Sequence, residues 1–124
     1  MQTINSCDQK QLSFRLINRK IYLIYEDYSD IEKAVEKSKC LLNDTNSCYK
    51  IVKIHCCNNI SATNTKERIL RCLKNYNKTY DTIFIIETEL IQKLLYSVKK
   101  HFVWEKVTAR DIVDKIQCYI EGFH

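Results

Sequence analysis

Four carboxylates follow the two most apolar segments of the chain and are the first candidates for chemistry. Glu26 and Asp27 come directly after one such segment, and Glu87 and Glu89 come at the end of the other. If the two segments are neighbouring parallel strands, these carboxylates lie at the carboxyl edge of the sheet, where α/β proteins place their sites. Carboxylate oxygens suit a hard divalent cation, so a metal-dependent site is one hypothesis. Acidic residues that favour a helix N-terminus and solubility explain the same pattern without a ligand.

Basic and aromatic side chains are interleaved over residues 99–106, in the order Lys-Lys-His-Phe-Val-Trp-Glu-Lys. Such a mixture can stack on bases and neutralise phosphates, so nucleic-acid binding is a second hypothesis. The same stretch also suits a helix C-terminus followed by an edge strand, with lysines at the negative end of the helix dipole and the tryptophan covering the core. A helix expected over 65–76 adds a basic stripe on its outer face. The members of this stripe are Arg71, Lys74 and Lys78.

Glycine and proline are nearly absent, which argues against several enzyme classes. The chain has one glycine, Gly122, and no proline. Phosphate-binding loops, dinucleotide fingerprints and nucleophile elbows all need glycine where the backbone turns sharply or approaches a ligand. The three histidines, His55, His101 and His124, have no recognisable catalytic neighbour, so a Cys/His or Ser/His pair lacks specific support. We therefore expect a non-enzymatic protein without a cofactor.

Seven cysteines raise the question of a disulfide framework or a metal site. The count is odd, no Cys-x-x-Cys occurs and the start of the chain lacks an export signal, so we expect buried, reduced thiols. The run His55-Cys56-Cys57 could supply metal ligands. Neighbouring side chains on a strand point to opposite faces, however, and no second ligand pair follows, so we expect no metal site there.

The composition is that of one globular domain, which we expect to be intracellular. The chain has 124 residues, of which 45% are hydrophobic, and a net charge of +5, which permits an acidic partner. No apolar run approaches the roughly 20 residues needed to span a bilayer, and the polar start lacks a signal peptide's hydrophobic segment. We expect a loose arm over residues 1–11 and a single α/β domain over residues 12–124.

Hydrophobic spacing predicts a three-layer α/β domain with a four-stranded parallel sheet. The runs 20–25 and 81–87 are apolar without alternation, which is typical of strands covered on both faces, so we place them side by side at the sheet centre. Partial alternation over 48–56 predicts an edge strand, and a short strand is expected over 102–107. The alternating order of strands and helices predicts right-handed parallel connections. Helical spacing predicts helices over 31–42, 65–76, 89–100 and 109–119.

Three helix starts carry a polar residue that is followed three positions later by an acidic one. In such a pair each side chain can satisfy a main-chain amide that the helix leaves without a partner. The three pairs are Ser29 with Glu32, Asn64 with Glu67, and Thr108 with Asp111.

The layout of the chain resembles a BRCT domain, most clearly in its second half. A flavodoxin-like domain has the same pattern of elements. The segments that resemble BRCT elements are, in chain order, 14–25, 31–42, 81–86, the helix that contains Lys93, 102–107 and 107–116.

The BRCT resemblance implies a nuclear protein-interaction module of DNA repair, replication or chromatin maintenance, with an acidic or phosphorylated partner. Lys93 matches that family's phosphate-contacting lysine, whereas Tyr25-Glu26-Asp27 stands in place of its phosphate-binding Ser/Thr-Gly. The acidic edge also resembles Toprim nuclease and receiver domains, which implies the metal-dependent alternative. We expect protein binding through Lys93, Lys99, Lys100 and Trp104.

Overall fold

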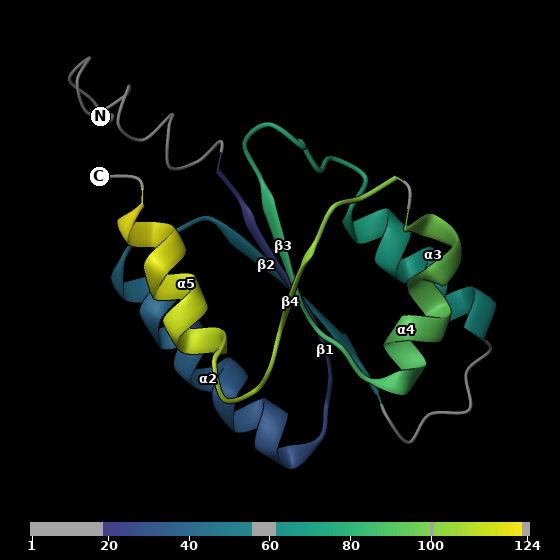
Figure 1. The fold of residues 1–124 in the computed structure, drawn as a ribbon, viewed down its shortest axis with the longest axis horizontal. Coiled ribbons are helices and arrows are strands. Elements are labelled where there is room, and N and C mark those ends of the chain that lie inside the picture. Colours follow the sequence, from purple (N-terminus) through teal and green to yellow (C-terminus); the bar gives the residue numbers. More distant parts are fainter. Residues whose placement is uncertain (1–18, 56–61, 100, 123–124) are drawn as a thin grey trace, which may run out of the picture.

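The structure is a computed structural model that describes residues 19–55, 62–99 and 101–122. These residues form a four-stranded parallel sheet with helices on both faces (Figure 1), which confirms the expected α/β class. The elements are, in chain order, β1 (Ile21–Glu26), α2 (Ser29–Asp44), β2 (Tyr49–Ile54), α3 (Ala62–Cys72), β3 (Thr82–Ile86), α4 (Glu89–Leu95), the 3-10 turn η1 (Tyr96–Val98), β4 (Glu105–Val107) and α5 (Ile112–Glu121).

β1 and β3 are the two central strands of the sheet, whose order is β2-β1-β3-β4. They run parallel, with Leu23 of β1 paired with Phe84 of β3. All six residues of β1 are buried, because the sheet is covered on both faces. A carboxylate oxygen of Asp81 accepts a hydrogen bond from the Lys20 main-chain amide at 2.9 Å, which joins the starts of the two strands. The prediction that the two continuous apolar runs are neighbours at the sheet centre is therefore confirmed.

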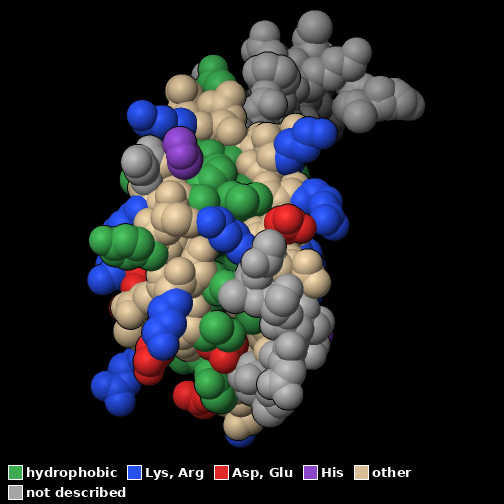
Figure 2. Space-filling view, turned by 90° about the vertical axis from the view of Figure 1, so that its right-hand side faces the viewer, with side chains coloured by type: hydrophobic (Ala, Val, Ile, Leu, Met, Phe, Trp, Pro, Cys, Tyr) green, Lys and Arg blue, Asp and Glu red, His purple; other side chains and the backbone are tan. Residues whose placement is uncertain are grey.

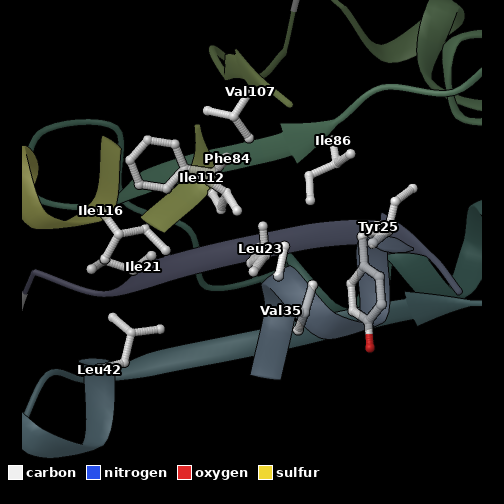
Figure 3. Close-up of a cluster of buried hydrophobic side chains, with 12 residues drawn as sticks. Ile21, Leu23, Tyr25, Val35, Leu42, Phe84, Ile86, Val107, Ile112 and Ile116 are labelled. Atoms are coloured by element: carbon white, nitrogen blue, oxygen red, sulfur yellow. The ribbon is translucent and has the colours of Figure 1, made fainter. Parts of the chain in front are cut away.

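Two hydrophobic clusters fill the space between the sheet and its helices. On one face, alternate residues of β1 (Ile21, Leu23 and Tyr25) pack against α2 and α5, as Figure 3 shows. On the other face, Tyr22 and Ile24 pack against α3 and α4. Each fully buried aliphatic or aromatic side chain contributes about 1.5–3 kcal/mol relative to an exposed one, so these clusters hold the sheet in place.

Several elements differ in length from their predicted ranges. α4 ends at Leu95 and continues as the 3-10 turn, so the helix expected over 89–100 is shorter than predicted. α3 spans Ala62–Cys72, which puts Asn64 inside the helix, so the expected cap by Asn64 and Glu67 is wrong. β4 has only three residues, Glu105–Val107, so the strand expected over 102–107 is shorter than predicted.

The capping box at the start of the last helix is confirmed. The Thr108 main-chain amide donates to Asp111 Oδ1 at 2.6 Å, and the Asp111 amide donates back to Thr108 Oγ1 at 3.2 Å. These bonds close a turn just before α5 and satisfy two amides that the helix leaves without partners.

The capping box expected at the start of α2 does not form. Tyr28 is the residue that precedes this helix, and no side chain there accepts a bond from the first turn. The Glu32 carboxylate instead accepts hydrogen bonds from the Tyr25 hydroxyl at 3.1 Å and from the Lys53 ammonium group at 3.0 Å. A local prediction is replaced here by contacts that connect β1, α2 and β2.

The described cysteines are free thiols, but they are less buried than expected. Cys40 and Cys118 are exposed, and Cys48 and Cys72 are partly buried, so the expectation of buried thiols is wrong for the first two. Cys7, Cys56 and Cys57 lie outside the described residues, as does the expected arm over 1–11. No helix in the described part of the chain has the length and apolar character to cross a membrane.

Candidate functional site

The carboxyl ends of β1 and β3 meet at the centre of one edge of the sheet. The chain passes from β1 outward to β2 on one side and later builds β3 and β4 on the other. In open α/β sheets this reversal of strand order creates the crevice where ligands usually bind. Glu26, Asp27, Glu87 and Thr88 all belong to these strand ends.

The acidic side chains at this edge have separate partners. Glu26 is 2% exposed and accepts a hydrogen bond from the Thr88 hydroxyl. Asp27 lies 2.9 Å from His55 Nδ1, and Glu89 forms a surface ion pair with Lys93 at 3.2 Å. Within the described ranges, no three His, Cys, Asp or Glu side chains form a group that could hold a metal ion. The structure therefore does not bring these carboxylates to one metal centre.

Glu87 connects three elements at this edge. Its Oε1 accepts a hydrogen bond from the Gln92 side-chain amide of α4 at 2.8 Å. Its Oε2 accepts one from the Trp104 indole at 3.3 Å and lies 3.8 Å from Lys106 Nζ of β4. Because the Glu87 side chain is only 14% exposed, these contacts hold the indole in a defined orientation.

A pocket of about 280 Å³ lies between α4, η1 and β4, and we call it the Trp104 pocket. It brings together two of the four predicted protein-binding residues, Lys99 and Trp104. Lys93 does not line it, and Lys100 lies outside the described residues. The full lining is Glu87, Gln92, Tyr96, Lys99, Trp104 and Lys106.

Sequence reasoning missed several members of this pocket. Gln92, Tyr96 and Lys99 are spaced by four and three positions, which places them on one side of a helical segment, so their spacing could have indicated a shared face. Tyr96 is 77% exposed, an unusual setting for a large aromatic residue. Glu87 and Lys106 reach the same pocket because β3 pairs with β4, and no local sequence pattern reveals that pairing.

The three residues predicted to form a basic stripe on one helix are Arg71, Lys74 and Lys78. α3 ends at Cys72, so only Arg71 lies on the helix, while Lys74 and Lys78 lie in the turns that follow, and the predicted helical stripe is wrong. All three side chains are exposed. Tyr76, which lies between the two lysines in sequence, packs on Phe102 with ring centroids 5.7 Å apart, and its hydroxyl donates to the Val103 carbonyl at 3.4 Å. The segment around Tyr76, which carries Lys74 and Lys78, therefore neighbours the stretch 99–106.

Lys and Arg side chains are spread over the face that carries α3 and α4. Figure 2 shows this face, with blue basic groups across it and most of the red acidic groups in its lower half. In the part of the chain that the structure describes, no acidic side chain forms an ion pair with Arg71, Lys74, Lys78 or Lys99. These four cations are open to an acidic ligand.

A second pocket, of about 450 Å³, lies between β4 and α5, and we call it the acidic pocket. Hydrogen bonds from the Thr108 amide and hydroxyl lower the pKa of Asp111, which keeps that carboxyl charged. Burial raises the pKa of the Tyr119 phenol, so Tyr119 is neutral at physiological pH. The lining consists of Glu105, Asp111, Asp114, Lys115, Cys118 and Tyr119.

Comparison with known proteins adds no relative to these observations. A scan against protein-family models found no match, and searches of curated proteins and of solved structures found no significant match.

Proposed function

We propose that this domain is a non-enzymatic protein-interaction module that binds an acidic segment of another protein at the Trp104 pocket. The observation that carries this proposal is the gathering of Trp104, Tyr96 and Lys99 around one small cavity, with the indole fixed by Glu87. Aromatic residues held in place around a pocket are the usual anchors of protein interfaces, because they bury much area at little cost in entropy.

The charges of the Trp104 pocket favour an acidic ligand. Glu87 accepts hydrogen bonds from Gln92 and Trp104 and lies near Lys106, so its charge is largely compensated. Lys99 is exposed and lines the same cavity. A partner carboxylate or phosphate would pair with Lys99, while an adjacent apolar group would contact the aromatic rings.

The BRCT resemblance supports the same class of function. The four-stranded parallel sheet with helices on both faces agrees with that layout. On this proposal the domain serves as a scaffold in DNA repair, replication or chromatin maintenance, inside the nucleus. Lys93 then provides a second positive charge near the pocket, although its present partner is Glu89.

An array of synthetic acidic peptides, with and without a phosphorylated residue, tests the proposal. Lys99→Ala and Tyr96→Ala change exposed side chains, so both variants should stay folded. Each should weaken the selected peptides by about tenfold, which corresponds to about 1.4 kcal/mol. Lys37→Ala, an exposed lysine of α2 on the opposite side of the sheet, is the matched control. If folded Lys99→Ala and Tyr96→Ala proteins bind as well as the control does, the proposal fails.

Nucleic-acid binding is a second candidate, favoured by the contacts of Tyr76, which lies between Lys74 and Lys78, with Phe102 and Val103 of the stretch 99–106. Exposed cations on both segments could follow a phosphate backbone, and such binding weakens steeply as salt rises. Replacing Arg71, Lys74 and Lys78 with alanine should then reduce the affinity for a single-stranded oligonucleotide and lower the slope of affinity against salt. Oligonucleotide binding that is insensitive to ionic strength would rule this candidate out.

A further inference from the structure

β4 is the outer strand on one side of the sheet, and its two faces border different pockets. Side chains alternate along a strand. Lys106 lines the Trp104 pocket on the α4 side, whereas Glu105 lines the acidic pocket on the α5 side. Val107, which has the same orientation as Glu105, is buried in the cluster beneath α2 and α5. One three-residue strand therefore separates the two pockets.

The two pockets have opposite charge. In the Trp104 pocket Lys99 and Lys106 face the single carboxylate of Glu87. In the acidic pocket one lysine, Lys115, stands among three carboxylates. These carboxylates are Glu105, Asp111 and Asp114.

The opposite edge of the sheet is protected in a way that β4 is not. Lys50 and Lys53 are exposed on alternate faces of β2, and Arg68 of α3 donates a hydrogen bond to the Lys53 carbonyl. Exposed charges occur on both edges, because Glu105 and Lys106 of β4 are exposed as well, so the cover by Arg68 is what distinguishes β2 from β4. Among the residues that the structure describes, no side chain forms a hydrogen bond with the main chain of β4. The described residues therefore leave the outer main-chain groups of β4 without a side-chain partner.

We propose that β4 binds an extended segment of a partner protein as an additional strand, and that this segment alternates acidic and basic side chains. Its acidic side chains would enter the Trp104 pocket and its basic side chains the acidic pocket, because successive residues of a strand point to opposite faces. The inference rests on the proposed function, which it deepens by naming the conformation and the charge pattern of the bound segment.

A second copy of this chain fits the β4 edge poorly. In the antiparallel arrangement that pairs all three residues of two β4 strands, Lys106 lies directly opposite the Lys106 of the other copy. Like charges directly opposite each other destabilise a strand pair. The charge pattern therefore selects a different sequence as the added strand.

Synthetic peptides of about eight residues, a common strand length, test the charge pattern. We expect a peptide of alternating Glu and Lys to bind at least about tenfold more tightly than a peptide of the same composition with all Glu before all Lys. Asp114→Lys, on the exposed face of α5, should weaken the alternating peptide by about tenfold. The matched charge reversal Asp44→Lys, at the end of α2, should leave it unchanged. Equal binding of the two peptides would overturn the inference.

N-methylation of the peptide amides tests the strand geometry. In a strand, residues whose side chains lie on one face of the sheet also direct their main-chain N–H groups to one edge of the strand. In the alternating peptide, either the amides of all Glu residues or those of all Lys residues therefore point toward β4. Methylating one of the two sets should abolish binding, and methylating the other should be tolerated. If both sets or neither are sensitive, the peptide is not an added strand. If the methylation result fails but Lys99→Ala still weakens the acidic peptides, the proposed function stands and only the added-strand inference is overturned. If Lys99→Ala has no effect on any peptide, both the proposed function and the added-strand inference are overturned.

Discussion

Removal of the Glu32 carboxylate is predicted to destabilise the domain more than a surface ion pair alone would. Glu32 accepts hydrogen bonds from the Tyr25 hydroxyl at 3.1 Å and from Lys53 Nζ at 3.0 Å. The two donors differ in their access to water, because Tyr25 is 1% exposed while the Lys53 side chain is 45% exposed. In Glu32→Ala the lysine stays in contact with water, whereas the Tyr25 hydroxyl loses its acceptor at a part-buried position.

The cost of Glu32→Ala follows from these exposures. A buried hydroxyl left without a partner costs about 1–3 kcal/mol. Loss of the solvent-exposed pair with Lys53 adds little, because water screens it. Alanine favours the helix slightly more than glutamate does, which stabilises the variant by only a few tenths of a kcal/mol. We therefore expect a net loss of about 2 kcal/mol in the free energy of unfolding.

Urea unfolding of four variants measures this effect. Lys53→Met should cost much less stability than Glu32→Ala, because it removes only the exposed pair. Tyr25→Phe removes the hydroxyl without leaving a buried donor, so the double variant Tyr25→Phe/Glu32→Ala should lose less stability than the sum of the single variants. The expected coupling is about 0.5–3 kcal/mol. Additive losses, or a Glu32→Ala protein no less stable than Lys53→Met, would refute the reasoning.

Three further predictions concern the alkaline range, the last helix and the core. Burial, and after it the Glu32 carboxylate, raises the pKa of Tyr25, so the native protein keeps a proton that the unfolded chain releases at high pH. The free energy of unfolding should therefore fall as pH rises above about 10. Urea unfolding across that range should show a smaller fall for Tyr25→Phe. Asp111→Ala removes the cap of α5 and should cost about 0.5–2 kcal/mol. Because the pKa of Asp111 is lowered, this contribution is present at neutral pH and lost as pH falls through the folded-state pKa, which unfolding in acid would reveal. Leu23→Ala, at a fully buried position, should cost about 2–5 kcal/mol in the same assay, whereas Leu90→Ala, at an exposed position, should cost far less.

The sheet was predictable from sequence because its signal is dense and local. The two central strands are continuous apolar runs, and only strands covered on both faces need such runs. Their position at the centre then determined which shorter runs, near 48–56 and 102–107, had to lie at the edges, and the observed order agrees.

Two of the predicted helix caps show when local spacing is sufficient and when it is not. Thr108 and Asp111 bond to each other in a solvent-facing turn, so the pattern of two residues was sufficient. Glu32 has the same spacing from Ser29, but its carboxylate reaches Tyr25 and Lys53, which satisfy it from other elements. Sequence spacing alone cannot rank a local bond against a tertiary one.

The candidate site was predicted in fragments. The stretch 99–106 indicated Lys99 and Trp104, but Glu87 was grouped with a hypothetical metal site rather than with the tryptophan. The decisive contact joins Glu87 to Trp104 across the β3–β4 pair, and it depends on a register that the sequence does not state.

The two edges of the sheet explain why binding is expected at β4 rather than elsewhere. A scaffold with two tightly packed clusters offers a partner only its surface helices and its strand edges. β2 has the longer edge, yet the Arg68 side chain covers its main chain at Lys53. β4 is short, so it cannot recruit a strand through main-chain bonds alone, and affinity must come from the pockets on its two faces. Because those pockets have opposite charge, β4 can select a partner by its charge pattern, although β4 offers fewer main-chain hydrogen bonds than β2 does.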